Sequence, residues 1–256
     1  MPLRATDIVL PVVGMEPGSS RPRELCGTAF HIGGGAYLTA AHVWKQAQTH
    51  PLQAIGMTDT PDTEVVRCHG VWKAEALEAF DLAVLSAPPF GQSFLWSKQL
   101  PALLDEVRAF GYPYGLDPES NMLTVRAFKG SVSGGNSLIK LPGRPFGLEL
   151  SFPCPRGLSG APLIWFQPEK SRIVGIVLGN QITEMEVYRE AEKLVEDGKE
   201  TLFIKTEALH LGLAIRADAV LSIHSETLGC TIGDWLKTYG LLDGDSLGSG
   251  TAPIRG

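Results

Sequence analysis

Glycine and proline are unusually frequent in this chain, and they limit what it can fold into. The 256 residues include 29 glycines and 18 prolines. Both residues interrupt regular elements, because glycine adopts left-handed turns and proline lacks a backbone N–H. Such frequent interruption favours many short strands joined by turns over long helices. The chain is long enough for one large β domain or two small ones, so we expect an all-β protein.

A hairpin is the first local structure that the sequence predicts. Residues 24–32 and 36–41 have strand-like composition, and the glycines from Gly33 to Gly35 form a tight turn between them. This hairpin delivers His42 at the end of its second strand. Further strand-like runs occur at 64–72, 81–86, 106–111, 122–132, 147–152, 161–166, 172–178, 201–205 and 213–215.

Two segments interrupt this strand pattern in a different way. The stretch from Pro88 to Pro101 is rich in turn-forming residues and reads as a connector between two halves. Residues 184–197 are highly charged and have a helical stripe, so they predict a helix inserted in the second half. Many short strands in two halves fit a closed or nearly closed β architecture. Periodicity alone does not separate two barrels from a sandwich.

Charge and hydropathy exclude two classes of partner. The net charge is −6 and no cluster of lysine and arginine stands out, so we expect no nucleic-acid binding. No apolar run approaches the roughly 18 residues of a membrane span. The apolar run near the start is short and is interrupted by Asp7 and Pro11. We read it as a first strand and not as a signal peptide, which favours a cytoplasmic location.

The cysteine pattern gives no sign of a metal site or a disulfide framework. The four cysteines form no CxxC pair, and no histidine follows them at zinc-binding spacing. A chain of this length needs no disulfide bonds to fold, so we expect four free thiols and no metal. These cysteines are Cys26, Cys68, Cys154 and Cys230.

Three segments carry the residue types that nucleophilic acyl chemistry requires. A serine hydroxyl must be activated by an adjacent base, and a carboxylate must orient that base. Residues 38–43 (Leu-Thr-Ala-Ala-His-Val) contain His42, and residues 80–85 (Phe-Asp-Leu-Ala-Val-Leu) place Asp81 at the start of an apolar strand. Residues 157–163 (Gly-Leu-Ser-Gly-Ala-Pro-Leu) hold Ser159 between two glycines. Each segment alone is weak evidence, but the ordered set favours a catalytic triad.

In this order and spacing, the three segments resemble those of trypsin-like serine proteases. They are similar above all to the bacterial branch of HtrA and glutamyl-endopeptidase types, whose segments are Thr-Ala-Ala-His, Asp-Leu-Ala-Val and Gly-x-Ser-Gly-Gly-Pro. The hairpin segment at 27–32 (Gly-Thr-Ala-Phe-His-Ile) resembles the family's Gly-Thr-Gly-Phe-x-Ile. Further likeness at 109–113, 174–177 and 212–215 extends the resemblance over roughly residues 7 to 222.

The resemblance implies a serine endopeptidase that needs no cofactor and acts on a protein or peptide substrate. It implies that His42 is the general base, that Asp81 orients it and that Ser159 attacks the carbonyl. The N–H groups of Gly157 and Ser159 would form the oxyanion hole. Substrate would bind against a wall of residues that includes Leu178, Gly179 and Asn180.

The resemblance also implies a division of the chain into two barrels. The first barrel would carry His42 and Asp81, and the second would carry Ser159. The residues after 222 are too few for a PDZ domain. In chain order, we expect a six-stranded β-barrel at 1–92, a second at 93–222 with a helical insertion at 181–200, a C-terminal helix at 223–242 and a disordered tail at 243–256.

The sequence departs from the family pattern at four places. Ala161 stands where the family has a second glycine, and its methyl group is tolerated unless the backbone there needs a positive φ. Val43 follows His42 where secreted members have a disulfide-bonded cysteine. Leu158 replaces the aspartate that a new N-terminus pairs with in zymogen activation. The insertion at 181–200 is a candidate gate, or a contact for a regulatory protein partner.

We expect an active endopeptidase that is either narrow in specificity or regulated, and two other functions compete with it. One is a catalytically weak or inactive protease fold that serves as a protein-binding module, which the substitution at Ala161 keeps open. The other is an α/β-hydrolase esterase. That class expects the order serine, acid, histidine and a glycine at position 161, and the sequence has neither.

Overall fold

The computed structural model confirms an all-β protein. Strands dominate the regular structure, and the few helices are short. Within the described part, no helix combines the length and apolar character that crossing a membrane requires. The structure describes residues 5–19, 21–57, 62–64, 67–114, 122–167, 170–193 and 200–243.

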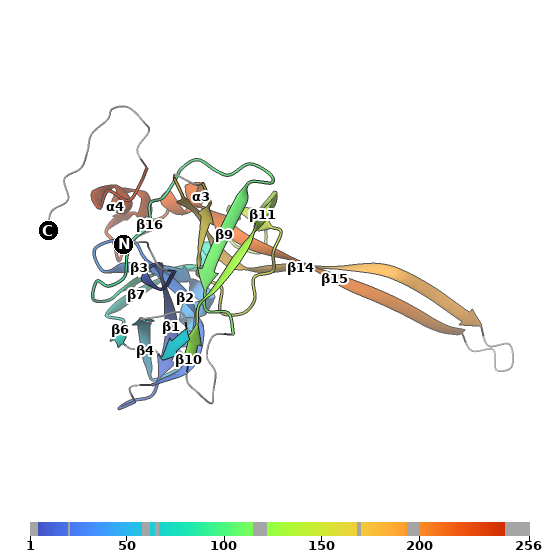
Figure 1. Ribbon diagram of the computed structural model, residues 1–256, viewed down its shortest axis with the longest axis horizontal. Helices are drawn as coiled ribbons and strands as arrows, with labels where there is room; N and C mark the ends of the chain where they lie inside the picture. The colour runs from blue at the N-terminus through green and yellow to red at the C-terminus, as the bar shows by residue number, and fades with distance from the viewer. Residues whose placement is uncertain are drawn as a thin grey trace.

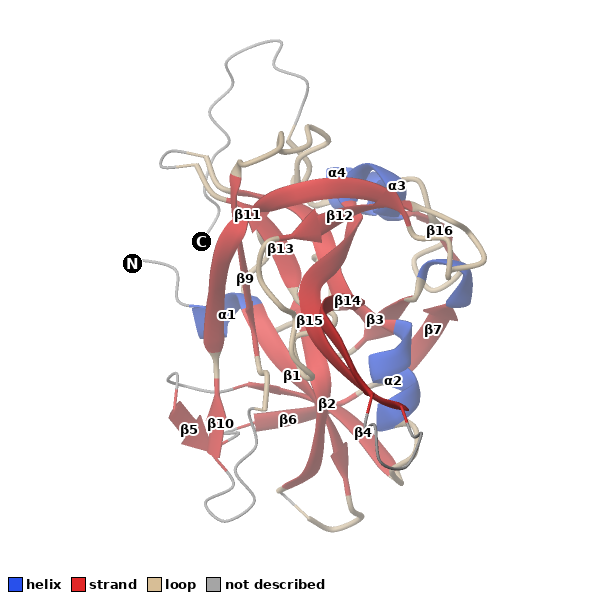
Figure 2. Ribbon diagram, turned by 90° about the vertical axis from the view of Figure 1, so that its right-hand side faces the viewer, coloured by secondary structure: helices blue, strands red, loops and turns tan. Residues whose placement is uncertain are grey.

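The N-terminal half is a curled sheet of seven strands in the order β6-β4-β1-β2-β3-β8-β7. Figure 2 labels these strands except β8. The predicted hairpin is present as β2 and β3, with Gly33, Gly34 and Gly35 all at positive φ in its turn. The strands are β1 (Val9–Met15), β2 (Pro22–His31), β3 (Ala36–Ala40), β4 (Leu52–Met57), β6 (Arg67–Gly70), β7 (Lys73–Leu77) and β8 (Leu82–Ser86).

This sheet differs from the six-stranded barrel that we expected for residues 1–92, because it has seven strands and its edges do not pair to close it. Its two edge strands, β6 and β7, are not paired with each other but are consecutive in the chain. Val71 N–H donates to the Gln53 carbonyl on one edge, and Trp72 N–H donates to the Ser86 carbonyl on the other. The chain therefore passes from one edge of the sheet to the other at residues 71–72.

The C-terminal half is a closed barrel of six strands in the order β11-β12-β15-β14-β13-β9, as expected. The boundary that we placed between 92 and 93 falls in the connection between β8 and β9. The barrel strands are β9 (Glu106–Gly111), β11 (Arg126–Ser137), β12 (Phe146–Leu150), β13 (Pro162–Trp165), β14 (Arg172–Lys193) and β15 (Glu200–Arg216).

The helix predicted over 184–197, within the helical insertion expected at 181–200, is wrong for residues 184–193. Residues 184–193 continue β14, and the backbone pairs with β15 through Lys193 and Glu200. The result is a long two-stranded ribbon that projects from the barrel (Figure 1). Both strands already pair inside the barrel, so the ladder continues outward, and this pairing overrides the local helical periodicity. Residues 194–199 lie outside the described part.

Short elements complete the fold. The C-terminal helix expected at 223–242 is present as α4, but it is shorter than expected because residues 224–225 and 230–231 form a pair of short strands. Residues 244–256 of the expected disordered tail lie outside the described part. The remaining elements are α1 (Ala5–Ile8), α2 (Ala41–Ala47), the 3₁₀ helix η1 (Glu78–Phe80), α3 (Ala217–Leu221), α4 (Ile232–Thr238), and the strand pairs β5 (Asp62–Glu64) with β10 (Met122–Thr124) and β16 (His224–Ser225) with β17 (Cys230–Thr231).

Separate hydrophobic cores lie inside each half, and a further core joins them. The joining core brings Phe30 and Leu38 of the sheet against Ile176 and Ile215 of the barrel. Leu236 of α4 packs into the same core, so the C-terminal helix contributes to the contact between the two halves. Burial of apolar surface on this scale holds the two halves in a defined relation, which matters because the predicted site draws on both.

Candidate active site

His42 and Asp81 form a hydrogen-bonded pair at one end of the N-terminal sheet. The Nδ1 atom of His42 lies 2.7 Å from Oδ2 of Asp81, and the backbone N–H of His42 donates to Oδ1 at 3.0 Å. The His42 side chain is 45% exposed and that of Asp81 is 21% exposed. With Nδ1 directed at the carboxylate, Nε2 is the nitrogen left to accept a proton from another group.

Strand pairing explains why these two residues meet. Strands β3 and β8 are antiparallel and pair Ala40 with Leu82, so the residues just beyond these ends lie together. Asp81 adopts a left-handed backbone conformation with φ of 52°, which aspartate tolerates better than most residues. Its carbonyl and carboxylate accept the first N–H groups of α2, which would otherwise lack partners.

Ser159 lies on the loop between β12 and β13, in the other half of the molecule. Its hydroxyl donates to the Leu178 carbonyl at 3.0 Å. Among the described residues, no hydrogen bond joins this hydroxyl to His42. The loop is fixed at its backbone instead, because Thr28 N–H donates to the Ser159 carbonyl at 2.9 Å and Gly160 N–H to the Val177 carbonyl at 2.8 Å.

The backbone before Ser159 leaves two N–H groups free. Among the described residues, neither the N–H of Gly157 nor that of Ser159 has a hydrogen-bond partner. The Arg156 carbonyl accepts the Tyr114 N–H at 3.1 Å. Carbonyl and N–H of one trans peptide point in opposite directions, so the Gly157 N–H is turned away from Tyr114. Two free donors beside a serine can stabilise a developing oxyanion.

Gly157 has no substitute at its position. Its φ is 98°, and a Cβ atom there would lie 2.3 Å from the Tyr112 carbonyl oxygen. Ala161, by contrast, is not among the described residues with positive φ, and its methyl group is fully buried in the barrel core. The replacement of the family's glycine at this position therefore introduces no backbone strain.

Thr28 is a residue that the sequence reasoning missed. It is fully buried on β2, and its hydroxyl donates to the Gly157 carbonyl at 2.7 Å while accepting the Tyr112 N–H at 3.1 Å. Together with its backbone bond to Ser159, Thr28 holds the carbonyls on both sides of Leu158. The sequence showed a threonine after Gly27 in a strand, which carries no signal for contacts 129 residues away.

The predicted substrate wall faces a cavity beside Asp81. This cavity has a volume of about 320 Å³, and its lining includes Leu178, Gly179, Asn180, Asp81 and residues 136–141. Since Ser159 contacts the Leu178 carbonyl, the predicted triad and the predicted wall gather around one region of the surface.

Asn180 has a second contact that the sequence did not predict. Its side chain accepts the Cys154 N–H at 2.5 Å and donates to the Cys154 carbonyl at 2.9 Å. The Asn180 side chain therefore links the segment that precedes Gly157 to the segment that follows Leu178. Behind this bridge, a Cβ atom on Gly212 would lie 2.6 Å from the Cys154 sulfur, so the space is filled.

The free thiols expected from the sequence are confirmed, because all four cysteines are unpaired. Burial raises the pKa of Cys154 to about 12, so this thiol stays protonated and packs as a small apolar group. Among the described residues, the side chains whose ligand atoms lie close enough for a metal ion are Glu24, Cys26 and His50. None of them belongs to the predicted site.

Comparison with solved structures identifies the fold. The Rv3671c protease of Mycobacterium tuberculosis H37Rv, in the inactive form of a serine-to-alanine mutant, matches with a TM-score of 0.53 at 15% identity over 84% of each chain. The MamO protease domain of Magnetospirillum magneticum matches with a TM-score of 0.53 at 16% identity, over 86% of this chain and 98% of that one.

The HtrA-type protease AlgW, in a serine-to-alanine form with tripeptide, has a TM-score of 0.53 at 18% identity. The match covers 84% of this chain but only 57% of AlgW, so the two differ in extent. No family model matches the chain, and no curated protein matches it in sequence. The structural likenesses show that the protein has the trypsin-like serine protease fold.

Proposed function

We propose that this protein is a serine endopeptidase that cleaves peptide bonds through an acyl-enzyme. The observation that carries the proposal is the His42–Asp81 pair at 2.7 Å, set beside a serine loop whose Gly157 and Ser159 N–H groups have no hydrogen-bond partner in the described part of the chain. A base oriented by a carboxylate, a serine and two unengaged donors are the parts that acyl transfer requires.

Each residue has a defined part in this mechanism. The Ser159 hydroxyl exchanges its bond with the Leu178 carbonyl for one with Nε2 of His42, which takes its proton as Oγ attacks the substrate carbonyl. Asp81 keeps Nδ1 protonated and stabilises the imidazolium that forms. The Gly157 and Ser159 N–H groups receive the oxyanion. His42 then donates the proton to the leaving amine. In the second half of the reaction, water gives a proton to His42 and attacks the acyl-enzyme, and His42 returns the proton to Ser159 as the acyl group leaves.

The Asn180 bridge favours narrow specificity. In the proposed complex, the substrate side chain next to the attacked carbonyl lies between segments 154–157 and 178–180. The two hydrogen bonds between Asn180 and the Cys154 backbone occupy that gap. We therefore expect a small residue, such as glycine or alanine, at this substrate position.

Labelling with a fluorophosphonate probe tests the reaction itself. The native chain should be labelled, whereas Ser159→Ala should not be, and His42→Ala should react far more slowly because its serine lacks a base. Ser222→Ala, which removes an exposed hydroxyl at the C-terminal end of α3, is the matched control and should label normally. An intact triad with no labelling of folded protein would instead favour an inactive fold that binds a partner.

Peptide substrates that differ at one position test the specificity. Replacing Asn180 by glycine removes the bridge and should raise kcat/KM for peptides with leucine or phenylalanine before the cleaved bond by about 10-fold relative to alanine. Gln181→Ala, at a neighbouring residue of the same cavity, should leave that ratio unchanged. A native enzyme that already prefers bulky residues would refute the role of Asn180.

A further inference from the structure

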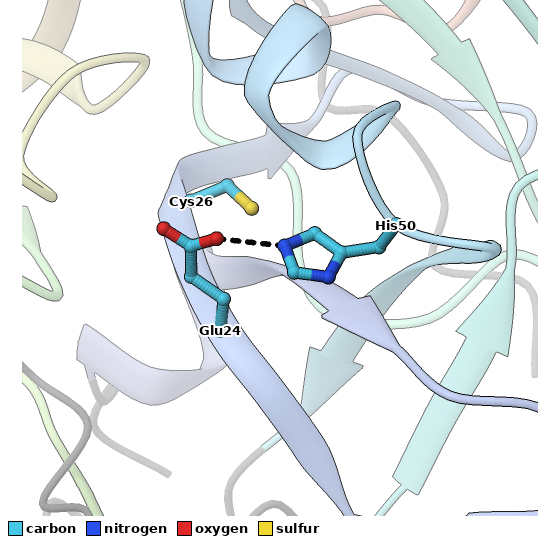
Figure 3. Close-up of side chains that lie close together, drawn as sticks. All are labelled: Glu24, Cys26 and His50. Atoms are coloured by element: carbon cyan, nitrogen blue, oxygen red, sulfur yellow. Dashed lines mark hydrogen bonds and ion pairs between the residues drawn. The ribbon is translucent and has the colours of Figure 1, made fainter.

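Three side chains with different ligand atoms converge at a place outside the proposed active site. Glu24 and Cys26 come from β2, and His50 follows α2 (Figure 3). One ligand atom from each residue, a carboxylate oxygen, a thiol sulfur and an imidazole nitrogen, lies within 4.8 Å of the other two. Their positions at 24, 26 and 50 match no familiar zinc-binding spacing, so only the fold brings them together.

The backbone positions these side chains before any ligand arrives. The β1–β2 register jumps at Cys26, because Val12 pairs with Gly27 and Val13 pairs with Leu25. Such a bulge redirects the side chain of the extra residue. His50 is held at both backbone groups, since its N–H donates to Ala47 and its carbonyl accepts from Gln53.

The imidazole of His50 lies directly against a glycine. A Cβ atom on Gly14 would be 2.1 Å from the ring, so no other residue at that position would leave room for it. The His50 side chain is 11% exposed, and Cys26 is buried. The ring and the thiol therefore form the closed side of the cluster.

The two carboxylate oxygens of Glu24 have different surroundings. Its Oε1 atom accepts hydrogen bonds from Gln46 at 2.5 Å and from Arg156 at 3.2 Å. Its Oε2 atom lies 2.7 Å from Nε2 of His50. Residues that hold the outer oxygen of a carboxylate are typical supports for a metal ligand, because they fix its direction without occupying the inner oxygen.

The set of donors indicates which ion would fit. Thiolate, imidazole and carboxylate together are ligands of Zn²⁺, whose bonds to nitrogen and oxygen are about 2.0–2.2 Å and to sulfur about 2.3 Å. Ligand atoms around a tetrahedral ion are then about 3.3–3.6 Å apart. The distance of 2.7 Å between Oε2 of Glu24 and Nε2 of His50 would have to increase by less than about 1 Å. The increased distance stays below the 4.8 Å within which the three ligand atoms already lie.

We propose that Glu24, Cys26 and His50 form a binding site for one Zn²⁺ ion, with water in the fourth position. The Glu24 side chain is 35% exposed and offers the path by which the ion enters and the water binds. The ion's two positive charges would balance the thiolate and the carboxylate. Arg156 and Gln46 would remain as supporting residues on Oε1. This site does not depend on peptidase activity.

Cobalt is the probe that tests the site, because Co²⁺ takes the place of Zn²⁺ in tetrahedral sites and absorbs light. We expect the chelator-treated full chain to bind one Co²⁺ with an intense visible spectrum and a thiolate-to-cobalt charge-transfer band. Addition of Zn²⁺ should bleach both. Cys26→Ser should abolish the charge-transfer band, whereas Cys68→Ser, at a free thiol outside the cluster, should keep it.

Two further variants keep the test decisive if Cys26→Ser folds poorly. His50→Gln should lose tight binding as well, and Gln46→Ala should weaken Zn²⁺ binding by about 10-fold while keeping the charge-transfer band. Circular dichroism of each metal-free variant checks that it is folded. Absence of stoichiometric Co²⁺ binding to the native chain, or a charge-transfer band that survives in Cys26→Ser, would overturn the proposal and leave a hydrogen-bonded cluster without a metal.

Discussion

His42 and Asp81 are held by two neighbouring strands of one sheet, whereas Ser159 is held by contacts that cross from one half of the molecule to the other. The first pair needs only β3 and β8 and the hydrogen bonds at the start of α2. The Ser159 loop is bonded to Thr28 of the N-terminal sheet as well as to Val177 of its own barrel.

This difference has a consequence for stability and for reactivity. The base and its acid form within a single sheet, so changes at the junction between the halves should leave them in place. Ser159 and the N–H groups of Gly157 and Ser159 depend on the junction, so the same changes should disturb them first. Mutations that separate the two effects can test this comparison.

The largest effect is expected inside the His42–Asp81 pair. Asp81→Asn keeps the shape of the side chain but offers an N–H where the imidazole needs an acceptor, so His42 takes the wrong tautomer. We expect kcat on a cleaved peptide to fall by about 10⁴-fold while thermal unfolding changes little. Glu78→Gln, at an exposed carboxyl in the adjoining 3₁₀ helix, should have almost no effect. A loss of less than 10-fold for Asp81→Asn would contradict the assigned role.

A smaller effect is expected where the two halves meet at the serine loop. Thr28→Val keeps the shape but removes the hydroxyl, so its hydrogen bond to the buried Gly157 carbonyl and the one that it accepts from the Tyr112 N–H are both lost. We expect a loss of about 1–3 kcal/mol in unfolding free energy and a fall of about 10- to 100-fold in kcat with KM nearly unchanged.

Thr39→Val provides a matched comparison for Thr28→Val. It removes another buried hydroxyl bond of 2.7 Å, to the Thr28 carbonyl, without touching a carbonyl of the serine loop. Its cost in stability should be similar and its effect on kcat much smaller. Equal losses of kcat in the two variants would mean that Thr28 acts only through stability.

The smallest effect is expected where the C-terminal segment docks on the N-terminal sheet. Glu75 of β7 accepts hydrogen bonds from the Ser225 hydroxyl and from the N–H groups of Glu226 and Thr227. Partial burial alone would raise the pKa of Glu75, but these hydrogen bonds outweigh it and hold the pKa below its ordinary value. The ionised carboxylate therefore stabilises the folded chain.

Glu75→Gln should accordingly cost about 1–2 kcal/mol in unfolding free energy at pH 7. A group whose pKa is lowered by folding stabilises fully above its unfolded pKa, near 4.3, and loses that contribution as pH falls through the folded value. Denaturant unfolding of both chains at several pH values should show the difference shrinking below about pH 4. Glu226→Gln, at an exposed neighbour, is the control, and a difference that grows in acid would refute the role of Glu75.

Much of the fold could be predicted from local patterns. The turn from Gly33 to Gly35 predicted the β2–β3 hairpin, and the apolar run after Asp81 predicted β8. Residues 184–193 show where this reasoning fails. Their helical periodicity is a weak preference, and the backbone hydrogen bonds available from β15 decide the conformation.

The sequence by itself determined which chemical groups are present and the order in which they occur: a histidine after a strand, an aspartate before the next strand, and a serine between two glycines. It did so because turns, strands and short motifs depend on residues that are only a few positions apart in the chain. The tertiary structure alone decided that Asn180 bridges to Cys154, that Thr28 holds the serine loop, and that Glu24, Cys26 and His50 converge. Those contacts join residues distant in the chain, and no local pattern encodes such a distance.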